Sequence, residues 1–246
     1  MKYLSVGTNY IGDLYFQKIQ NGNGFKPYGG LWATKQEEGS VEYNEWIDYL
    51  CQHPYLLFYK GQNNMFNQPA VFLTLKNNAN IFNIDDQRKI DFIIKKYPDN
   101  HGWINYEKLS KDYDGIYIDL SKIENMFQKE TIDKLQEFCV STLVLFNSSC
   151  ISYYQKACVE FETTDIYDYR GLRNYFINIE PTKYHVDQKK EEEILLLNKM
   201  TDFIKSQKLE SNKENQELVV NKFNKEINNC TVDNDLQRLI LRKVFN

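Results

Sequence analysis

Along the N-terminal part of the chain, apolar positions gather in short runs separated by Gly, Pro, Asn and Asp. Runs of this length, rich in β-branched and aromatic residues, predict β-strands. The run at 55–59 fits either a buried strand or the end of a helix. The run at 141–147 is nearly all apolar, which predicts a central strand buried on both faces. The expected strands cover residues 3–8, 31–34, 69–75, 80–84, 116–120 and 141–147.

Helices are predicted where apolar residues recur every three or four positions. Asp85 or Asp86 is the expected N-cap of the second helix, and Tyr97-Pro98 ends it. Residues 155–181 follow no single periodicity. The expected helices cover residues 41–50, 85–97, 104–111 and 123–138.

The chain changes character from Asp187 onward, where it becomes charged and helical in pattern. Two or three amphipathic helices, joined by the polar stretch 210–215, are expected there. The predicted organisation is α+β, with a main domain at 1–183 and a helical extension at 184–246. The extension is expected to pack on the main domain, to self-associate or to bind a partner.

Composition narrows the class of protein. The 246 residues are 42% hydrophobic, enough to bury a core, and the net charge of −4 gives no overall attraction to nucleic acid or to an anionic membrane. No apolar run is long enough to span a bilayer, and the N-terminus does not resemble a signal peptide, so a cytoplasmic protein is expected. The scattered cysteines and histidines form no metal motif.

The segment 26–34, Lys-Pro-Tyr-Gly-Gly-Leu-Trp-Ala-Thr, is the strongest local signal. The adjacent glycines Gly29 and Gly30 allow positive φ and let a flat ligand approach the main chain. A large side chain at Gly30 is therefore expected to block the ligand cleft. The alternative is a tight turn that leads into a buried strand.

Several segments resemble, in their order, the ADP-ribosyltransferase superfamily, especially its small bacterial and phage-encoded members. The resemblance covers roughly residues 1–155 and rests on the shared order, since no single motif is specific. It implies a split β-sheet core with peripheral helices that holds NAD in a cleft between two half-sheets. The segments are Tyr3 to Thr8, Lys26 to Thr34, the region around Trp46, Val71 to Tyr97, Tyr113 to Ile116, and Thr142 to Asn147 followed by Ile151.

The resemblance also implies a set of cofactor-binding residues. The backbone of Gly7 is expected to bind the nicotinamide amide, and Thr8 stands where many relatives place a hydroxyl that contacts ribose or phosphate. Thr34 takes the structural Ser/Thr position of the second motif. The complete implied set is Gly7, Thr8, Tyr28, Gly30, Trp32 and Thr34.

Two departures from the family pattern concern catalysis. The first strand carries neither His nor Arg to hold ribose or phosphates, only Ser5. Register places the family's catalytic glutamate at Thr142, which supplies no negative charge to an oxocarbenium-like transition state. Asp114 and the pair Glu160 and Glu162 are candidate substitutes. Their alternative roles are a turn residue and a solvated face.

Three functions are open at this stage. The first is an NAD-dependent mono-ADP-ribosyltransferase, a glycosyltransferase that uses NAD as a substrate and acts on a protein, nucleic-acid or small-molecule acceptor. The second is an inactive relative that binds NAD or ADP-ribose, or that acts as an interaction module. The third is a phage or plasmid structural or accessory protein that works through its C-terminal helices.

Overall fold

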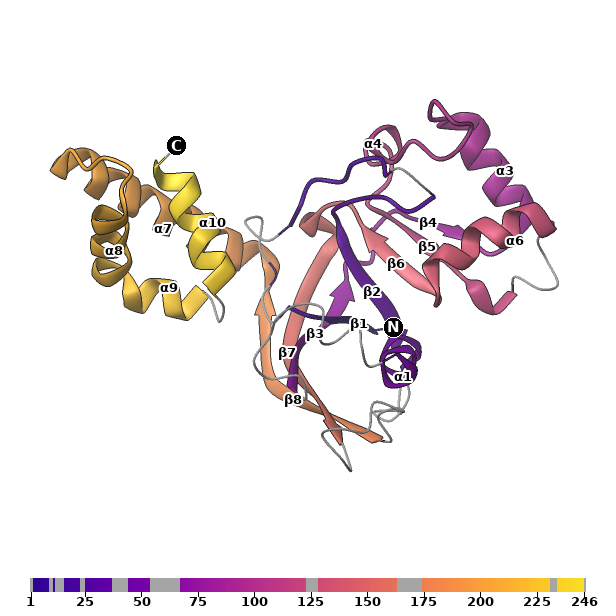
Figure 1. Ribbon diagram of the computed structural model, residues 1–246, viewed down its shortest axis with the longest axis horizontal. Coiled ribbons are helices and arrows are strands. Elements are labelled where there is room, and N and C mark those ends of the chain that lie inside the picture. The colour runs from indigo at the N-terminus through magenta and orange to yellow at the C-terminus, as the bar shows by residue number, and fades with distance from the viewer. Residues whose placement is uncertain are drawn as a thin grey trace.

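The computed structural model of the chain describes residues 2–8, 11, 16–22, 25–36, 44–53, 67–122, 128–162, 174–230 and 234–245. The apolar run at 55–59 and the first part of the helix expected at 123–138 lie outside these ranges. Within them the fold is α+β, as predicted, and consists of a mixed sheet with helices around it (Figure 1).

The sheet has eight strands in the order β4-β5-β6-β2-β1-β3-β7-β8. The β4–β5 pair is parallel, and every other neighbouring pair is antiparallel. In chain order the strands are β1 (Lys2–Val6), β2 (Leu31–Gln36), β3 (Asn67–Leu75), β4 (Ile81–Ile84), β5 (Gly115–Ile118), β6 (Thr142–Leu145), β7 (Ile151–Glu162) and β8 (Asn174–His185).

The most apolar strand is where the sequence places it. All four residues of β6 are buried, and the strand lies between β5 and β2, which confirms the prediction of a central strand. The region 155–181, which showed no single periodicity, contributes most of the long pair β7 and β8. β8 is the last strand of the sheet and exposes Phe176 and Ile179, so it lacks the regular alternation of a half-buried strand.

Helices follow the predicted segments, with shifted ends. Helix α3 starts after Asp86, whose carboxylate accepts a hydrogen bond from the Lys89 amide, and ends at Tyr97. The helices of the main domain are α1 (Glu45–Gln52), α3 (Gln87–Lys96), α4 (Tyr106–Leu109) and α6 (Lys129–Leu135), and the 3-10 turn η2 (Gln136–Phe138) follows α6.

The C-terminal part contains α7 (Val186–Gln207), α8 (Lys213–Lys222), α9 (Asn224–Cys230) and α10 (Asn234–Phe245), grouped beside β7 and β8 (Figure 1). Val186, Leu196 and Met200 of α7 belong to the same apolar cluster as Leu143 of β6, so these helices pack on the sheet. Among the described residues, no helix is both long and apolar enough to cross a membrane.

The two faces of the sheet are covered differently. One face forms a single core, which includes Leu31, Leu73 and Leu143 and continues into the C-terminal helices. The other face is divided into two cores. One, around Ile116, joins β4, β5 and β6 to α3, α4 and α6. The other, around Phe72, joins β1, β3, β7 and β8 to α1. This face of the single sheet therefore carries two separate cores, and β1 and β2 are the neighbouring strands between β6 and β3 in the sheet order.

Candidate functional site

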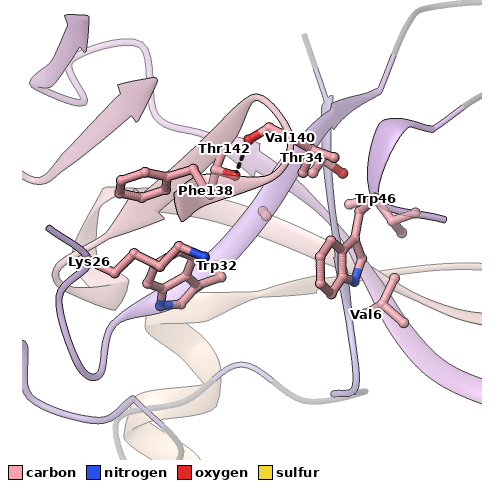
Figure 2. A pocket seen from close by; sticks show the side chains of 10 residues that line it. Val6, Lys26, Trp32, Thr34, Trp46, Phe138, Val140 and Thr142 are labelled. Carbon is pink, nitrogen blue, oxygen red and sulfur yellow. Dashed lines mark hydrogen bonds between the residues drawn. The ribbon is translucent and has the colours of Figure 1, made fainter. Parts of the chain in front are cut away.

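A cavity of about 320 Å³ lies where the two cores of the divided face meet. This volume falls at the lower end of the range typical of small-molecule sites. Figure 2 shows Trp32, Phe138 and Lys26 on one side, Trp46 and Val6 on the other, and Thr34 and Thr142 between them. The lining residues are Leu4, Val6, Lys26, Trp32, Ala33, Thr34, Trp46, Phe138, Val140 and Thr142.

Aromatic rings form the opposing walls of the cavity. Trp32 of β2 stacks on Phe138 of η2, with ring centroids 5.7 Å apart, and its indole N–H donates to the Gly29 carbonyl at 2.9 Å. Trp46 of α1 stacks on Tyr49, with centroids 5.6 Å apart. Since each wall is fixed by a second ring or a hydrogen bond, the cavity presents flat apolar surfaces that are already oriented.

Two threonine hydroxyls lie between these walls. Thr142 Oγ1 donates to the Val140 carbonyl at 2.7 Å, and Thr34 Oγ1 donates to Asn44 Oδ1 at 2.9 Å. Both side chains line the cavity. Because each hydroxyl proton is used within the protein, what these hydroxyls offer a ligand is mainly acceptor capacity.

Asn44 connects β2 to α1 and so positions Trp46. Its Oδ1 caps α1 by accepting from the amides of Trp46 and Ile47, and its Nδ2 donates to Gln36 Oε1 at 3.0 Å. Asn44, Thr34 and Gln36 are all buried. The hydrogen bond from the Thr34 hydroxyl to Asn44 therefore links the segment 26–34 to α1, the helix that carries Trp46 on the opposite wall of the cavity.

Replacing Asn44 by Ala is expected to lower the free energy of unfolding by about 3 kcal/mol. The loss combines an N-cap, worth about 1–2 kcal/mol, with buried polar groups left without a partner, at about 1–3 kcal/mol. Asn212→Ala is the matched control, since Asn212 caps α8 at an exposed position, and is expected to cost about 1 kcal/mol. Urea unfolding followed by circular dichroism measures both, and equal losses would show that the buried network contributes nothing.

A carboxylate that sequence reasoning missed lies beside the cavity. Glu45, in the first turn of α1, accepts a hydrogen bond from the Ser141 amide through Oε2 at 2.9 Å. Glu45 precedes Trp46 and Ser141 precedes Thr142, and both of those neighbours line the cavity. Burial, with the nearby charges of Asp119 and Glu45, raises the pKa of Tyr117. No sequence signal links Glu45 to Ser141, because 96 positions separate them.

The glycine pair has a structural role in its turn. Gly29 and Gly30 have φ of +76° and +70°, and a Cβ on Gly30 would lie 2.6 Å from the Leu145 carbonyl oxygen. A Cβ on Gly29 would collide with the Lys18 carbonyl oxygen. The close backbone approach predicted here is made by the protein's own chain. Consequently, a large residue at Gly30 would disrupt the β2–β6 pairing before it filled any cleft.

The other predicted cofactor-binding residues flank the cavity or lie away from it. Gly7 directly follows Val6, has φ of +98°, and its amide donates to the Pro69 carbonyl at 2.6 Å. Thr8 is buried, and Tyr28 is 58% exposed. Of the six predicted positions, Trp32 and Thr34 are among the described residues that line the cavity, and so is the predicted catalytic position Thr142.

Two of the three predicted substitute carboxylates, those of Asp114 and Glu160, lie away from the described lining of the cavity. Asp114 is in the turn before β5, where its carboxylate accepts from the Asn80 amide at 2.9 Å and from the Asn147 side chain at 3.1 Å. Glu160 of β7 accepts from Asn178 of β8 at 2.7 Å, on the half of the sheet that carries the second core. Glu162 is the last residue of β7, and its side chain lies outside the described part of the structure. Neither Asp114 nor Glu160 belongs to the described lining of the cavity.

Searches against protein-family models, curated proteins and solved structures gave no significant match for the chain. Within the described residues no group of His, Cys, Asp and Glu side chains is arranged to hold a metal ion. The site is therefore defined by its own geometry: two aromatic walls, two hydroxyls, one lysine and the Glu45 carboxylate that the Ser141 amide holds. The sequence analysis did not predict Lys26, Phe138 or Val140 as lining residues.

Proposed function

We propose that the cavity binds NAD and that the protein is an NAD-dependent mono-ADP-ribosyltransferase. The observation that carries the proposal is the position of the cavity, between the two separate cores on one face of the sheet. The family that the sequence resembles holds NAD in a cleft between two half-sheets. Trp32, Thr34 and Thr142, which the resemblance had singled out, line the same cavity.

The proposed reaction requires the protein to bind NAD and to place a negative charge near the ribose. Cleavage of the bond between nicotinamide and ribose passes through an oxocarbenium-like state, which a nearby carboxylate stabilises. Thr142 cannot provide that charge. In our proposal Glu45 provides it, since its carboxylate is held at the start of β6 by the Ser141 amide. No described Lys or Arg forms an ion pair with Glu45, so its negative charge remains available.

The experiment measures NAD binding and nicotinamide release on the same protein. NAD is expected to raise the melting temperature by several degrees, because a ligand that binds only the folded state stabilises it. Released nicotinamide, with cell lysate as a mixed acceptor, reports turnover. Val6→Trp, which fills the cavity from β1, is expected to abolish both effects, whereas Ile179→Trp on the exposed part of β8 leaves both intact.

A second function is favoured by one observation, namely that none of the described lining residues of the cavity carries a carboxylate. A module that binds NAD or ADP-ribose without turnover has this property. Stabilisation by NAD without nicotinamide release, even at high protein concentration and with lysate present, identifies the module. Absence of both effects in a folded wild-type protein rejects both functions.

A further inference from the structure

Among the described residues that line the cavity, Lys26 is the one that carries a charge. Its ammonium lies 5.6 Å from the centroid of the Phe138 ring, on the side where Phe138 stacks on Trp32 (Figure 2). Lys26 is half-buried, and its Nζ forms no ion pair with a carboxylate of any described residue. The cavity therefore contains a cation that lies beside an aromatic ring and is not paired with a carboxylate in the described part of the chain.

The neighbouring acidic group is engaged elsewhere. Glu137, which precedes Phe138, accepts a hydrogen bond from the Phe25 amide at 3.1 Å through Oε2. This bond ties the segment that carries Lys26 to η2. Phe25 itself packs edge-on against Phe138, with ring centroids 5.9 Å apart. Lys26 is thus held on a fixed segment by contacts of its neighbours, and its own ammonium remains available to a ligand.

We infer that Lys26 binds a phosphate group of the ligand, so that the cavity selects phosphorylated nucleotides over the corresponding nucleosides. The inference deepens the proposed function and rests on it, because NAD carries two phosphates between its two ring systems. A lysine ammonium is a compact charge that binds phosphate well. The flat aromatic walls beside the Lys26 ammonium can pack against a ring of the ligand while the ammonium binds a neighbouring phosphate. The first strand has no His or Arg to do this, and Lys26 supplies the charge from the loop before β2.

The test compares ligands that differ by phosphate. AMP and ADP-ribose are titrated against adenosine, with tryptophan fluorescence as the signal, because Trp32 and Trp46 line the cavity. Wild type is expected to bind AMP at least about 10-fold more tightly than adenosine, and Lys26→Met is expected to weaken AMP binding by about 10- to 100-fold. Adenosine binding is expected to stay unchanged in that variant. Added salt should weaken AMP binding in wild type and have less effect in Lys26→Met.

Two matched variants separate this role from a structural one. Lys26→Arg keeps the positive charge and is expected to retain AMP binding within a few-fold of wild type. Lys35→Met removes an exposed lysine from β2 whose side chain points to the opposite face from Thr34, and it should bind like wild type. Equal AMP affinity in Lys26→Met and wild type would overturn the inference, as would a parallel loss of adenosine binding.

The inference and the proposed function fail in different ways. If wild type binds AMP through Lys26 but neither binds NAD nor releases nicotinamide, the proposed function is rejected and the phosphate site stands. If NAD binds and Lys26→Met binds it equally well, the proposed function stands and the phosphate role of Lys26 is overturned. A single-stranded oligonucleotide that binds through Lys26, while AMP, ADP-ribose and NAD do not, would overturn the assignment to nucleotides.

Discussion

Glu45→Gln is expected to reduce nicotinamide release by about 100-fold and to leave NAD binding nearly unchanged. The substitution keeps the size of the side chain and its acceptor oxygen for the Ser141 amide, and it removes only the charge. A preorganised group that stabilises charge in the transition state is typically worth about 10²–10³ in rate. The loss should therefore fall on turnover, since the ground state of NAD gains little from this carboxylate.

Moving the charge to β6 is expected to restore activity. Thr142 lines the cavity, and in the resemblance to ADP-ribosyltransferases it stands at the position of their catalytic glutamate, so Thr142→Glu in the Glu45→Gln background returns a carboxylate to the start of β6. The control is Thr142→Gln in that background, which has the same shape and no charge. Single-turnover release of nicotinamide at saturating NAD, together with a thermal shift, separates chemistry from binding.

The outcomes distinguish the candidate functions. Activity that falls in Glu45→Gln and returns with Thr142→Glu, but not with Thr142→Gln, supports a carboxylate mechanism at the start of β6. Equal activity in wild type and Glu45→Gln would contradict the role proposed for Glu45. A wild type that binds NAD without turnover, and that gains nicotinamide release with Thr142→Glu alone, is a binding module that lacks only the charge.

Gly30→Ala is expected to lower the free energy of unfolding by about 3 kcal/mol. An L-residue at φ of +70° costs about 1–2 kcal/mol. The added Cβ would also lie 2.6 Å from the Leu145 carbonyl oxygen, and such overpacking adds about 1–3 kcal/mol. Leu145 pairs with Leu31 across β2 and β6, so the strain acts next to Trp32 at the wall of the cavity.

Gly102→Ala is the matched control for this prediction. Gly102 has φ of +80°, and a Cβ there would meet no atom within 4 Å, so that only the backbone strain remains. Its expected cost is about 1 kcal/mol. Chemical denaturation curves with equal slopes give both losses directly. Similar losses at the two positions would show that the approach of Gly30 to β6 is not tight in solution.

Segments with a clear local pattern were predicted well. The strands at 69–75 and 80–84, and the helix that starts after Asp86, needed only periodicity and a capping residue, both of which are local properties. The observed helix ends differ from the predicted ones by a few residues, because helix ends fray and tertiary contacts, which a local pattern does not encode, influence where each helix ends. No strand was predicted for most of β7 and β8. Of the two, β8 is the edge strand and exposes Phe176 and Ile179, so its sequence pattern does not alternate regularly.

The candidate site was only partly predictable. Short-range sequence patterns were enough to predict the α+β class, the central position of β6 and the helical C-terminal part. The three predicted residues that line the cavity came from the resemblance to ADP-ribosyltransferases. Tertiary structure alone brought Glu45 to Ser141 and placed Lys26 over Phe138, since these partners are far apart in the chain. The tertiary structure also showed that Gly29 and Gly30 are needed for close backbone packing. This role depends on the backbone that faces them, at Lys18 and at Leu145 of β6, which the local sequence does not reveal.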